Sequence, residues 1–292
     1  MRVLHLDSGR EMRGGQWQVL RLVEGLDREA VECTLMARPG SSLFLRAGKA
    51  GLRVEPLGLR RVLSLSRAHD LVHAHDARSH TMGLLARRPL LVSRRVAFPV
   101  GSRWKYRRAH HYLAVSDHVK SVLIAGGVPE EKISVVYDGV PLLDQAGGAK
   151  ILAPANAGDP QKGAALVLEG AHLAGVTVTL TSDLERDLPE AGVFVYITHS
   201  EGLGSAVLLA MSAGLPVIAS NTGGLREVIC HGENGMLVEN AAPAIAAAIR
   251  ELTANPGLAR SLGQAARRTV EERFTTAIMV RRTMEVYRQV LA

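Results

Sequence analysis

The sequence is poor in cysteine and aromatic residues, and it lacks a long apolar run free of glycine and proline. Cys33 and Cys230 are its only cysteines among 292 residues, which excludes a disulfide scaffold and is typical of a reduced, cytoplasmic protein. Aromatic residues make up 4%, so aliphatic side chains must form the core. The longest uncharged stretch, 202–225, contains glycines and a proline, and no secretory leader is predicted after Met1. Neither segment favours a membrane span.

Basic residues outnumber acidic ones in one half only. Residues 1–145 contain 23 Lys and Arg against 14 Asp and Glu, whereas residues 146–292 contain 12 against 14. The basic half includes the run Arg103–Arg108, in which aromatic residues lie between basic ones. Such a run is typical of peripheral contact with an anionic membrane, here the inner face, and a solvated helix face is the alternative. Because no nucleic-acid-binding motif accompanies it, nucleic acid is not an expected partner.

Short apolar runs alternate with segments of helical periodicity along the chain. Residues 138–148 interrupt this pattern with turn-forming residues, and the alternation then resumes. Strands that alternate with helices predict parallel sheets covered on both faces, so we expect an α/β protein with two doubly wound domains facing a cleft. The predicted strands are 3–6, 31–36, 71–74, 90–93, 112–115 and 133–136, then 151–153, 176–180, 193–197, 216–219 and 235–238.

The sharpest motif, 199–205, follows an apolar run and begins a helix. Glycines allow the backbone to approach a ligand, and the free N–H groups at a helix start suit a phosphate. Glu201 ends the strand, where its carboxylate can accept hydrogen bonds from hydroxyl groups. A plain turn capped by Ser205 is the alternative. The residues expected to contact the ligand are Glu201, Gly202, Leu203, Gly204 and Ser205.

Residues 200–228, SEGLGSAVLLAMSAGLPVIASNTGGLREV, resemble the signature of the retaining family 4 glycosyltransferases, which have the two-domain GT-B fold. The segments 13–16, 113–116, 133–140 and 274–291 are similar to further parts of that family. The resemblance implies an N-terminal acceptor-side domain, 1–145, and a shortened nucleotide-sugar-binding domain, 146–274. It also implies a C-terminal helix, 275–292, that crosses back to the N-domain.

The resemblance further implies transfer of a sugar from a nucleotide diphosphate sugar to an acceptor hydroxyl, with retention of the anomeric configuration. Neither a metal nor another cofactor is expected, and the sequence has no Asp-x-Asp motif. Fixed cations and backbone N–H groups must then stabilise the departing diphosphate. Lys162 matches the family's phosphate-binding lysine, and Gly14 and Gly15 would approach the diphosphate from the other domain. A surface lysine and a tight turn are the alternatives.

The segment from His69 to His80 contains four histidines and two aspartates. On a strand, His73 and His75 would point to one face, a spacing that suits a metal ion, and histidines bonded to the nearby backbone are the alternative. The resemblance instead places His75 and Asp76 on the acceptor side, where His75 would orient or deprotonate the acceptor hydroxyl. No metal site is therefore predicted.

The sequence also departs from the family pattern. Leu209 stands where the family has a second Glu that holds the ribose, and Asn156 stands where an Arg often precedes the lysine. Arg94 and Arg95 stand at the end of a strand where the family has a histidine, and they would supply positive charge to the acceptor side. Only 38 residues separate Lys162 from Glu201, fewer than the usual βα units need.

Two functions follow from these observations. The first is a glycosyltransferase of cell-envelope or polysaccharide synthesis, with a nucleotide sugar as donor and a glycan or lipid-linked acceptor. The alternative is a catalytically degenerate relative that binds a glycan or a protein partner.

Overall fold

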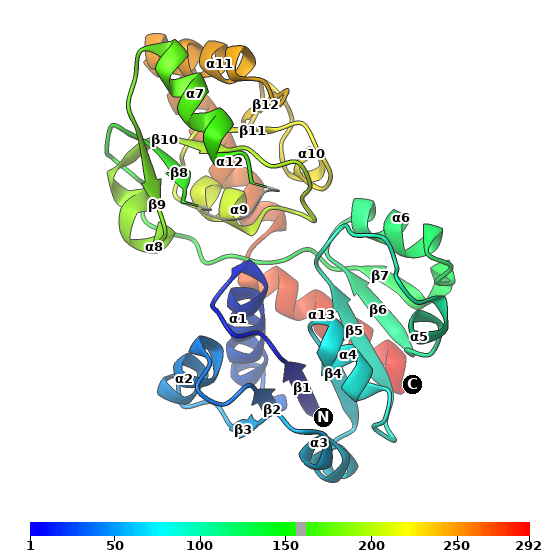
Figure 1. Cartoon of the computed structure of the whole chain (residues 1–292). Coiled ribbons are helices and arrows are strands. Elements are labelled where there is room, and N and C mark those ends of the chain that lie inside the picture. The colour runs from blue at the N-terminus through cyan, green and yellow to red at the C-terminus, as the bar shows by residue number, and fades with distance from the viewer. Residues whose placement is uncertain (156–161) are drawn as a thin grey trace. The chain divides into compact units, whose positions relative to one another are not determined.

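A computed structural model of the chain describes residues 1–155 and 162–292. The chain forms two compact units, one made of 1–139 with 276–292 and the other of 140–275 (Figure 1). Each unit contains a parallel sheet with helices packed on it, which confirms the predicted α/β class with two doubly wound domains. The chain passes between the units after Gly139 and after Thr275, where the sequence predicted divisions after 145 and 274.

The first unit is built on a seven-stranded sheet in the order β3-β2-β1-β4-β5-β6-β7. Its strands are β1 (Arg2–Asp7), β2 (Glu32–Ala37), β3 (Val54–Pro56), β4 (Leu71–Ala74), β5 (Leu90–Arg94), β6 (His111–Ala114) and β7 (Ile133–Val135). Its α-helices are α1 (Gly14–Arg28), α2 (Ser42–Lys49), α3 (Leu59–Leu65), α4 (Ala77–Gly83), α5 (Arg103–Arg107), α6 (Asp117–Ala125) and α13 (Thr276–Leu291). All predicted strands of this half are confirmed, whereas β3, α2 and α3 were not predicted.

One face of this sheet is covered by α1, α2 and α13, whose apolar side chains form a single core with those of the strands. The helix α13 follows the last helix of the second unit in sequence but packs in the first unit, beside α1 (Figure 1). Gly25 allows this close approach, because a Cβ atom there would lie 2.4 Å from Cγ2 of Val280. The predicted return of the C-terminal helix to the N-domain is therefore confirmed.

The second unit is built, within its described residues, on a five-stranded parallel sheet in the order β12-β11-β10-β8-β9. Its strands are β8 (Lys150–Pro154), β9 (Val178–Thr181), β10 (Ala191–Tyr196), β11 (Val217–Ser220) and β12 (Met236–Val238). Its α-helices are α7 (Ala164–Ala174), α8 (Leu184–Asp187), α9 (Ser205–Ser212), α10 (Leu225–Val228), α11 (Ala242–Ala254) and α12 (Pro256–Arg273). The strand β10 occupies the centre, as its continuous apolar sequence predicted.

The helices α7 and α11 share a core with one face of the second sheet. The helix α9, with six buried residues in eight, also packs against β10, β11 and α12. In the described part of the chain, none of the helices combines the length and the apolar character needed to traverse a bilayer.

Candidate functional site

In the second unit, Lys162, Tyr196 and Glu201 form one hydrogen-bonded cluster. The ammonium Nζ of Lys162 lies 2.8 Å from Oε2 of Glu201 and 2.5 Å from the hydroxyl of Tyr196. The same Tyr196 hydroxyl donates to Oε2 of Glu201. The Lys162 and Glu201 side chains are 20% and 16% exposed, so the cluster is partly open to solvent. The two residues predicted to hold the donor are therefore brought together.

Contacts between backbone segments hold Lys162 beside the end of β10. Lys162 forms an isolated antiparallel bridge with Thr198, and the N–H of Gly163 donates to the carbonyl of Ile197 over 2.9 Å. A Cβ atom at Gly163 would lie 2.5 Å from Cγ2 of Ile197, which explains the glycine after the lysine. This close approach places Lys162 beside the loop that carries Glu201.

A second backbone contact fixes the Glu201 loop from the other side. The N–H of Gly224 donates to the carbonyl of Glu201 over 3.2 Å. A Cβ atom at Gly223 would lie 2.2 Å from that same carbonyl oxygen, and one at Gly224 would lie 2.0 Å from the carbonyl oxygen of Gly202. The glycine pair therefore allows two loops to pack backbone against backbone.

The start of α9 has the geometry expected of a ligand-approach loop. Gly204 occupies the N-cap position with φ +100°, a left-handed conformation that favours glycine, and no side chain caps the helix. Ser205 is thus the first helical residue, so the alternative reading of it as the cap is wrong. The N–H of Gly202 donates to Oε1 of Glu201 over 3.1 Å. Leu203 is buried, at 2% exposure.

The family departures have distinct outcomes in the structure. Leu209 is 5% exposed and packs in the apolar body of α9, so it offers no hydrogen-bonding group to a ribose. Asn156 lies outside the described residues.

In the first unit, strand register brings polar residues together beneath α13. His5 on β1 pairs in register with His73 on β4, so both side chains lie on the same face of the sheet. His75 follows on that face at the carboxyl end of β4, and its Nε2 lies 3.0 Å from Nδ1 of His5. His73 contacts the hydroxyls of Tyr287 and Ser93 at 2.6 and 2.8 Å. His73 and His75 are thus bonded to side chains, whereas Nδ1 of His69 lies 2.7 Å from the backbone carbonyl of Leu65, as the alternative predicted.

Arg95 and Asp138 extend this chain of contacts. Nη1 of Arg95 lies 3.3 Å from Nδ1 of His75, and its Nε donates to Oδ1 of Asp138 over 2.9 Å. Because a guanidinium only donates, Nδ1 of His75 accepts and its Nε2–H donates to Nδ1 of His5. The remaining nitrogen of His5, Nε2, is buried and has no hydrogen-bond partner among the described residues.

Burial keeps these histidines neutral. It lowers the pKa of His5 to about 3, with further lowering from His69 and Arg95. Burial also lowers the pKa values of His73 and His75 well below the usual value, and Arg95 contributes to both shifts. Neutral rings are what a metal ion requires, and ligand nitrogens of His5, His73 and His75 lie within 4.8 Å of one another.

This cluster nevertheless fits a metal ion poorly. Both ring nitrogens of His73 already contact hydroxyl groups, and the Arg95 guanidinium next to His75 repels a cation. A metal-bound histidine usually donates the N–H of its other ring nitrogen to a carboxylate or carbonyl. In His75, Nδ1 instead faces the Arg95 guanidinium and Nε2 faces His5. We therefore assign no metal to it, and metal independence stays a prediction.

Of the other predicted acceptor-side residues, only Arg95 joins His75. Arg94 donates instead to the hydroxyl of Tyr106 and to the carbonyl of Phe98, at 2.8 and 2.5 Å. Asp76 caps α4 by accepting from the N–H groups of Arg78 and Ser79. Burial alone would raise its pKa, but hydrogen bonds from Ser79 and Ser8 lower it.

The predicted glycine loop begins α1. Gly14 is the first residue of this helix, and Arg13 at the N-cap makes no side-chain capping bond. A Cβ atom at Gly15 would meet none of the described residues within 4 Å. The neighbouring Gln16 donates to the carboxylate of Asp7, whose pKa is raised by burial and by Asp76. Contact of these glycines with a diphosphate stays a prediction.

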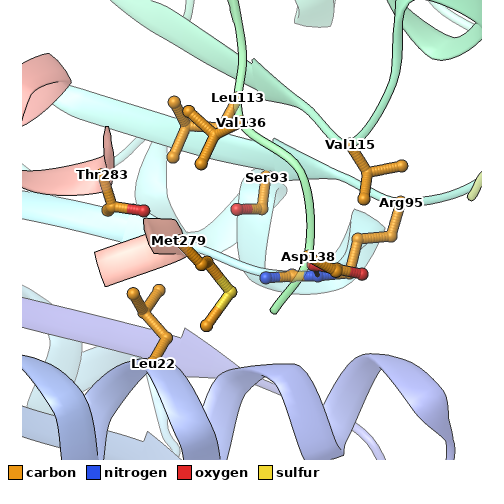
Figure 2. A pocket seen from close by; sticks show the side chains of 9 residues that line it. All are labelled: Leu22, Ser93, Arg95, Leu113, Val115, Val136, Asp138, Met279 and Thr283. Atoms are coloured by element: carbon orange, nitrogen blue, oxygen red, sulfur yellow. Dashed lines mark hydrogen bonds and ion pairs between the residues drawn. The ribbon is translucent and has the colours of Figure 1, made fainter. Parts of the chain in front are cut away.

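A pocket lies on the same face of the first sheet, between the strands, α1 and α13. Figure 2 shows the ion pair of Arg95 and Asp138 on one side of it and the side chains of Leu22 and Met279 on another. The lining residues are Leu22, Ser93, Arg95, Leu113, Val115, Val136, Asp138, Met279 and Thr283. Polar groups therefore enter this largely apolar pocket at the carboxyl ends of β5 and β7.

The basic run forms α5 and the residue after it. Trp104 is 66% exposed, and the Cζ atom of Arg108 lies 4.7 Å from the centroid of its ring. Phe98 and Val96, in the segment before this helix, are 49% and 42% exposed. Exposed apolar side chains thus lie close in sequence to the strongest concentration of positive charge.

Comparison with known proteins shows the family of the chain. The family model for glycosyltransferase family 4 matches residues 12–142, and that for glycosyl transferases group 1 matches residues 164–269. The alpha-maltose-1-phosphate synthase of Mycolicibacterium smegmatis is 36% identical over 119 residues, which are 38% of this chain and 31% of that protein. The capsular polysaccharide biosynthesis glycosyltransferase CapM of Staphylococcus aureus is 35% identical over 88 residues, which are 30% of this chain and 23% of CapM. The aligned regions thus span less than a third of either relative.

Solved structures match the whole chain. The Anabaena protein Alr3699/HepE, solved in complex with UDP-glucose, superposes with a TM-score of 0.86 at 16% identity, covering 99% of this chain and all of that one. Sucrose-phosphate synthase from Thermosynechococcus elongatus superposes with a TM-score of 0.81 at 17% identity, covering 99% of this chain and 98% of that one. The fold is thus the two-domain GT-B fold of glycosyltransferases. Within that class, the chain belongs to glycosyltransferase family 4.

Several residues of these clusters were not predicted. Tyr196 ends an apolar run that indicated only a buried strand, although a phenol at the end of a central parallel strand was a usable signal. His5 and Asp138 were missed because their link to His75 and Arg95 depends on strand order.

Proposed function

We propose that this protein transfers a sugar from a nucleotide diphosphate sugar to a hydroxyl group of a glycan or lipid-linked acceptor. The observation that carries the proposal is the cluster of Lys162 and Glu201 at the carboxyl end of a central parallel strand. A cation and a hydrogen-bond acceptor placed together suit a ligand with an anionic part and a hydroxylated part. A sugar diphosphate has both.

In this proposal, Lys162 binds the diphosphate and Glu201 accepts hydrogen bonds from sugar hydroxyls. As the bond between the anomeric carbon and the diphosphate oxygen breaks, negative charge grows on the leaving group, and the ammonium stabilises it. The acceptor oxygen forms the new bond to the same carbon, with retention and without a metal. The acceptor proton passes to the leaving phosphate, or to His75 if that residue deprotonates the hydroxyl.

The acceptor is proposed to bind on the first unit. There His75 orients or deprotonates its hydroxyl, and Arg95 holds the ring of His75 in place. Since Arg95 contacts Nδ1 and His5 contacts Nε2, neither nitrogen is free in the ligand-free protein. Acceptor binding must therefore displace one of these contacts before His75 can act on a hydroxyl.

Names of similar proteins support the choice of substrates. The HepE structures contain UDP, UDP with glucose, and UDP-glucose. CapM is named for capsular polysaccharide biosynthesis. We therefore propose a sugar nucleotide donor, with UDP-glucose as the first compound to test, and a role in envelope or polysaccharide synthesis.

A ligand screen followed by an activity assay tests the proposal. Thermal unfolding is measured with UDP, GDP and ADP and with UDP-glucose, UDP-N-acetylglucosamine, GDP-mannose and ADP-glucose. We expect stabilisation by one nucleotide and its sugar conjugate. Slow hydrolysis of that conjugate is the activity readout that needs no acceptor, and Lys162→Ala and Glu201→Ala are each expected to abolish it. Turnover retained in both variants would overturn the site.

The same screen separates the alternative function. A degenerate relative that only binds a partner is expected to show no stabilisation by any of these compounds at millimolar concentration. The loss of a ribose-binding carboxylate at Leu209 is the observation that favours this alternative.

Peripheral contact with an anionic membrane at the cytoplasmic face is a second part of the proposal. Exposed Trp104 beside the basic residues of α5 supports it, because an aromatic ring inserts among headgroups while cations attract anionic lipid. Vesicles of phosphatidylglycerol are expected to bind the protein, and vesicles of phosphatidylcholine are not. Trp104→Ala should weaken this binding, whereas equal binding to both lipids would contradict the proposal.

A further inference from the structure

We propose that Tyr196 is a positioning residue that holds the Glu201 carboxylate in place for the sugar of the donor. This inference rests on the proposed function and adds to it a residue that the family resemblance does not supply. It starts from the position of Tyr196 at the end of β10, a strand otherwise composed of Ala, Gly, Val and Phe. The ring is anchored in the core, since the residue is only 5% exposed, while its hydroxyl reaches the cluster.

The two oxygens of the Glu201 carboxylate have different partners. Oε2 accepts from both the Lys162 ammonium and the Tyr196 hydroxyl, whereas Oε1 accepts, among the described residues, only from the backbone N–H of Gly202, at 3.1 Å. Each carboxylate oxygen has two acceptor sites. Oε2 is therefore saturated, and Oε1 keeps one site for a sugar hydroxyl. Within the described part of the chain, Lys162 and Tyr196 are the only side chains that hydrogen-bond to this carboxylate.

Donor binding should change the hydrogen bonds of the Glu201 carboxylate. In the ligand-free protein, the ammonium of Lys162 is paired with Glu201, and the diphosphate of the donor competes with that carboxylate for the same cation. When Lys162 turns to the phosphate, Oε2 of Glu201 loses one of its two side-chain donors. The Tyr196 hydroxyl remains, because its ring is fixed by the core of the strand. Tyr196 thus keeps the carboxylate oriented at the moment when the sugar needs it.

Tyr196 should affect the affinity for only one part of the donor. If Tyr196 acts through Glu201, its hydroxyl contributes to the affinity for the sugar part of the donor and not for the nucleoside diphosphate part. Tyr196→Phe removes only the hydroxyl and keeps the buried ring. We expect the Kd of the sugar nucleotide to rise about tenfold, while the Kd of the matching nucleoside diphosphate changes less than about twofold.

The experiment measures both constants by calorimetry for UDP-glucose and UDP, or for whichever pair in the screen above stabilises the wild-type protein most. Four proteins are compared: wild type, Tyr196→Phe, Glu201→Ala and the double variant. We expect the double variant to bind the sugar nucleotide no more weakly than Glu201→Ala does, because the hydroxyl then has no carboxylate to hold. Tyr112→Phe is the matched control. Tyr112 lies in the first unit, and its buried hydroxyl donates to the backbone carbonyl of Tyr106 in that same unit.

The possible failures are distinguishable. Equal weakening of both ligands by Tyr196→Phe, or an additive loss in the double variant, would overturn the positioning role while leaving the proposed function intact. A Tyr112→Phe variant with the same selective loss would overturn it as well, because the effect would then follow from any lost phenol. No binding of any screened compound by the wild type would instead remove the proposed function, and this inference with it.

Discussion

The Lys162 ammonium lies 2.8 Å from the Glu201 carboxylate, although 39 positions separate the two residues in sequence. Backbone contacts hold both residues in place. Lys162 pairs with Thr198, and the carbonyl of Glu201 accepts a hydrogen bond from the N–H of Gly224. The pair is therefore preorganised, and the Glu201 carboxylate neutralises the charge of the Lys162 ammonium. This relationship leads to several measurable expectations.

Replacing the lysine should weaken binding of nucleotides with and without a sugar. Lys162→Met removes the cation that contacts the diphosphate, a group common to both ligands, so both Kd values should rise about 10- to 100-fold. Titration calorimetry at fixed ionic strength measures this change. Lys150→Met is the matched control, because Lys150 pairs with Glu190 in the same unit and is 53% exposed. Selective weakening of the sugar nucleotide alone would contradict the role given to Lys162.

The backbone contact behind Glu201 should be sensitive to a single methyl group. Gly224 has an ordinary φ of −68°, so Gly224→Ala adds no backbone strain but places Cβ 2.0 Å from a carbonyl oxygen. We expect a loss of about 1–3 kcal/mol in the free energy of unfolding, together with weaker donor binding. Gly257→Ala, where a Cβ atom meets nothing within 4 Å, should be close to neutral. Urea unfolding followed by circular dichroism measures both, and equal stability of the two variants would refute the contact.

The ion pair of Arg95 and Asp138 should contribute strongly to the stability of the first unit. Its side chains are only 13% and 10% exposed, so removing one partner leaves a mostly buried charge. Arg95→Met is expected to cost about 3–5 kcal/mol. Arg61→Met breaks a pair that is 57% exposed on the arginine side, and should cost less than about 1 kcal/mol. Both tryptophans, Trp17 and Trp104, lie in the first unit, so their fluorescence reports its unfolding. Similar losses in the two variants would contradict this ranking.

The buried histidines should make the first unit less stable in acid. The pKa of His5 is lowered to about 3 in the folded protein, whereas an unfolded histidine titrates near 6.5. Between these values the unfolded state binds more protons, so stability is lost as the pH falls below about 6.5, by about 1.4 kcal/mol per pH unit for this group. His5→Asn should show a shallower dependence between pH 6.5 and 4.5, measured by tryptophan fluorescence in urea. An unchanged slope would contradict the burial argument.

The central strands of both sheets were predictable because they are buried on both faces. Such strands must be apolar on both sides, and the runs at β1 and β10 show this in the sequence. The short edge strand β3 is only half-buried, so Val54–Pro56 carries no such signal. The partnership of Lys162 and Glu201 followed from a family resemblance rather than from any spacing rule. Arg94 and Arg95 looked equivalent in sequence, yet alternation along the strand sends them to different partners.

Local pattern was therefore sufficient for most of the elements and for the loop that carries Glu201, because helix periodicity, burial of strands and glycine turns act over a few residues. It missed β3, α2 and α3. The partners of each polar side chain were settled only by folding. His5 reaches His75 across 70 positions because β1 and β4 are neighbours in the sheet. Tyr196 reaches Lys162 across 34 positions because the backbone at Lys162 pairs with Thr198, just beyond the end of β10. Hydrogen bonds need atoms within about 3 Å, and that proximity is a property of packing rather than of any short stretch of chain.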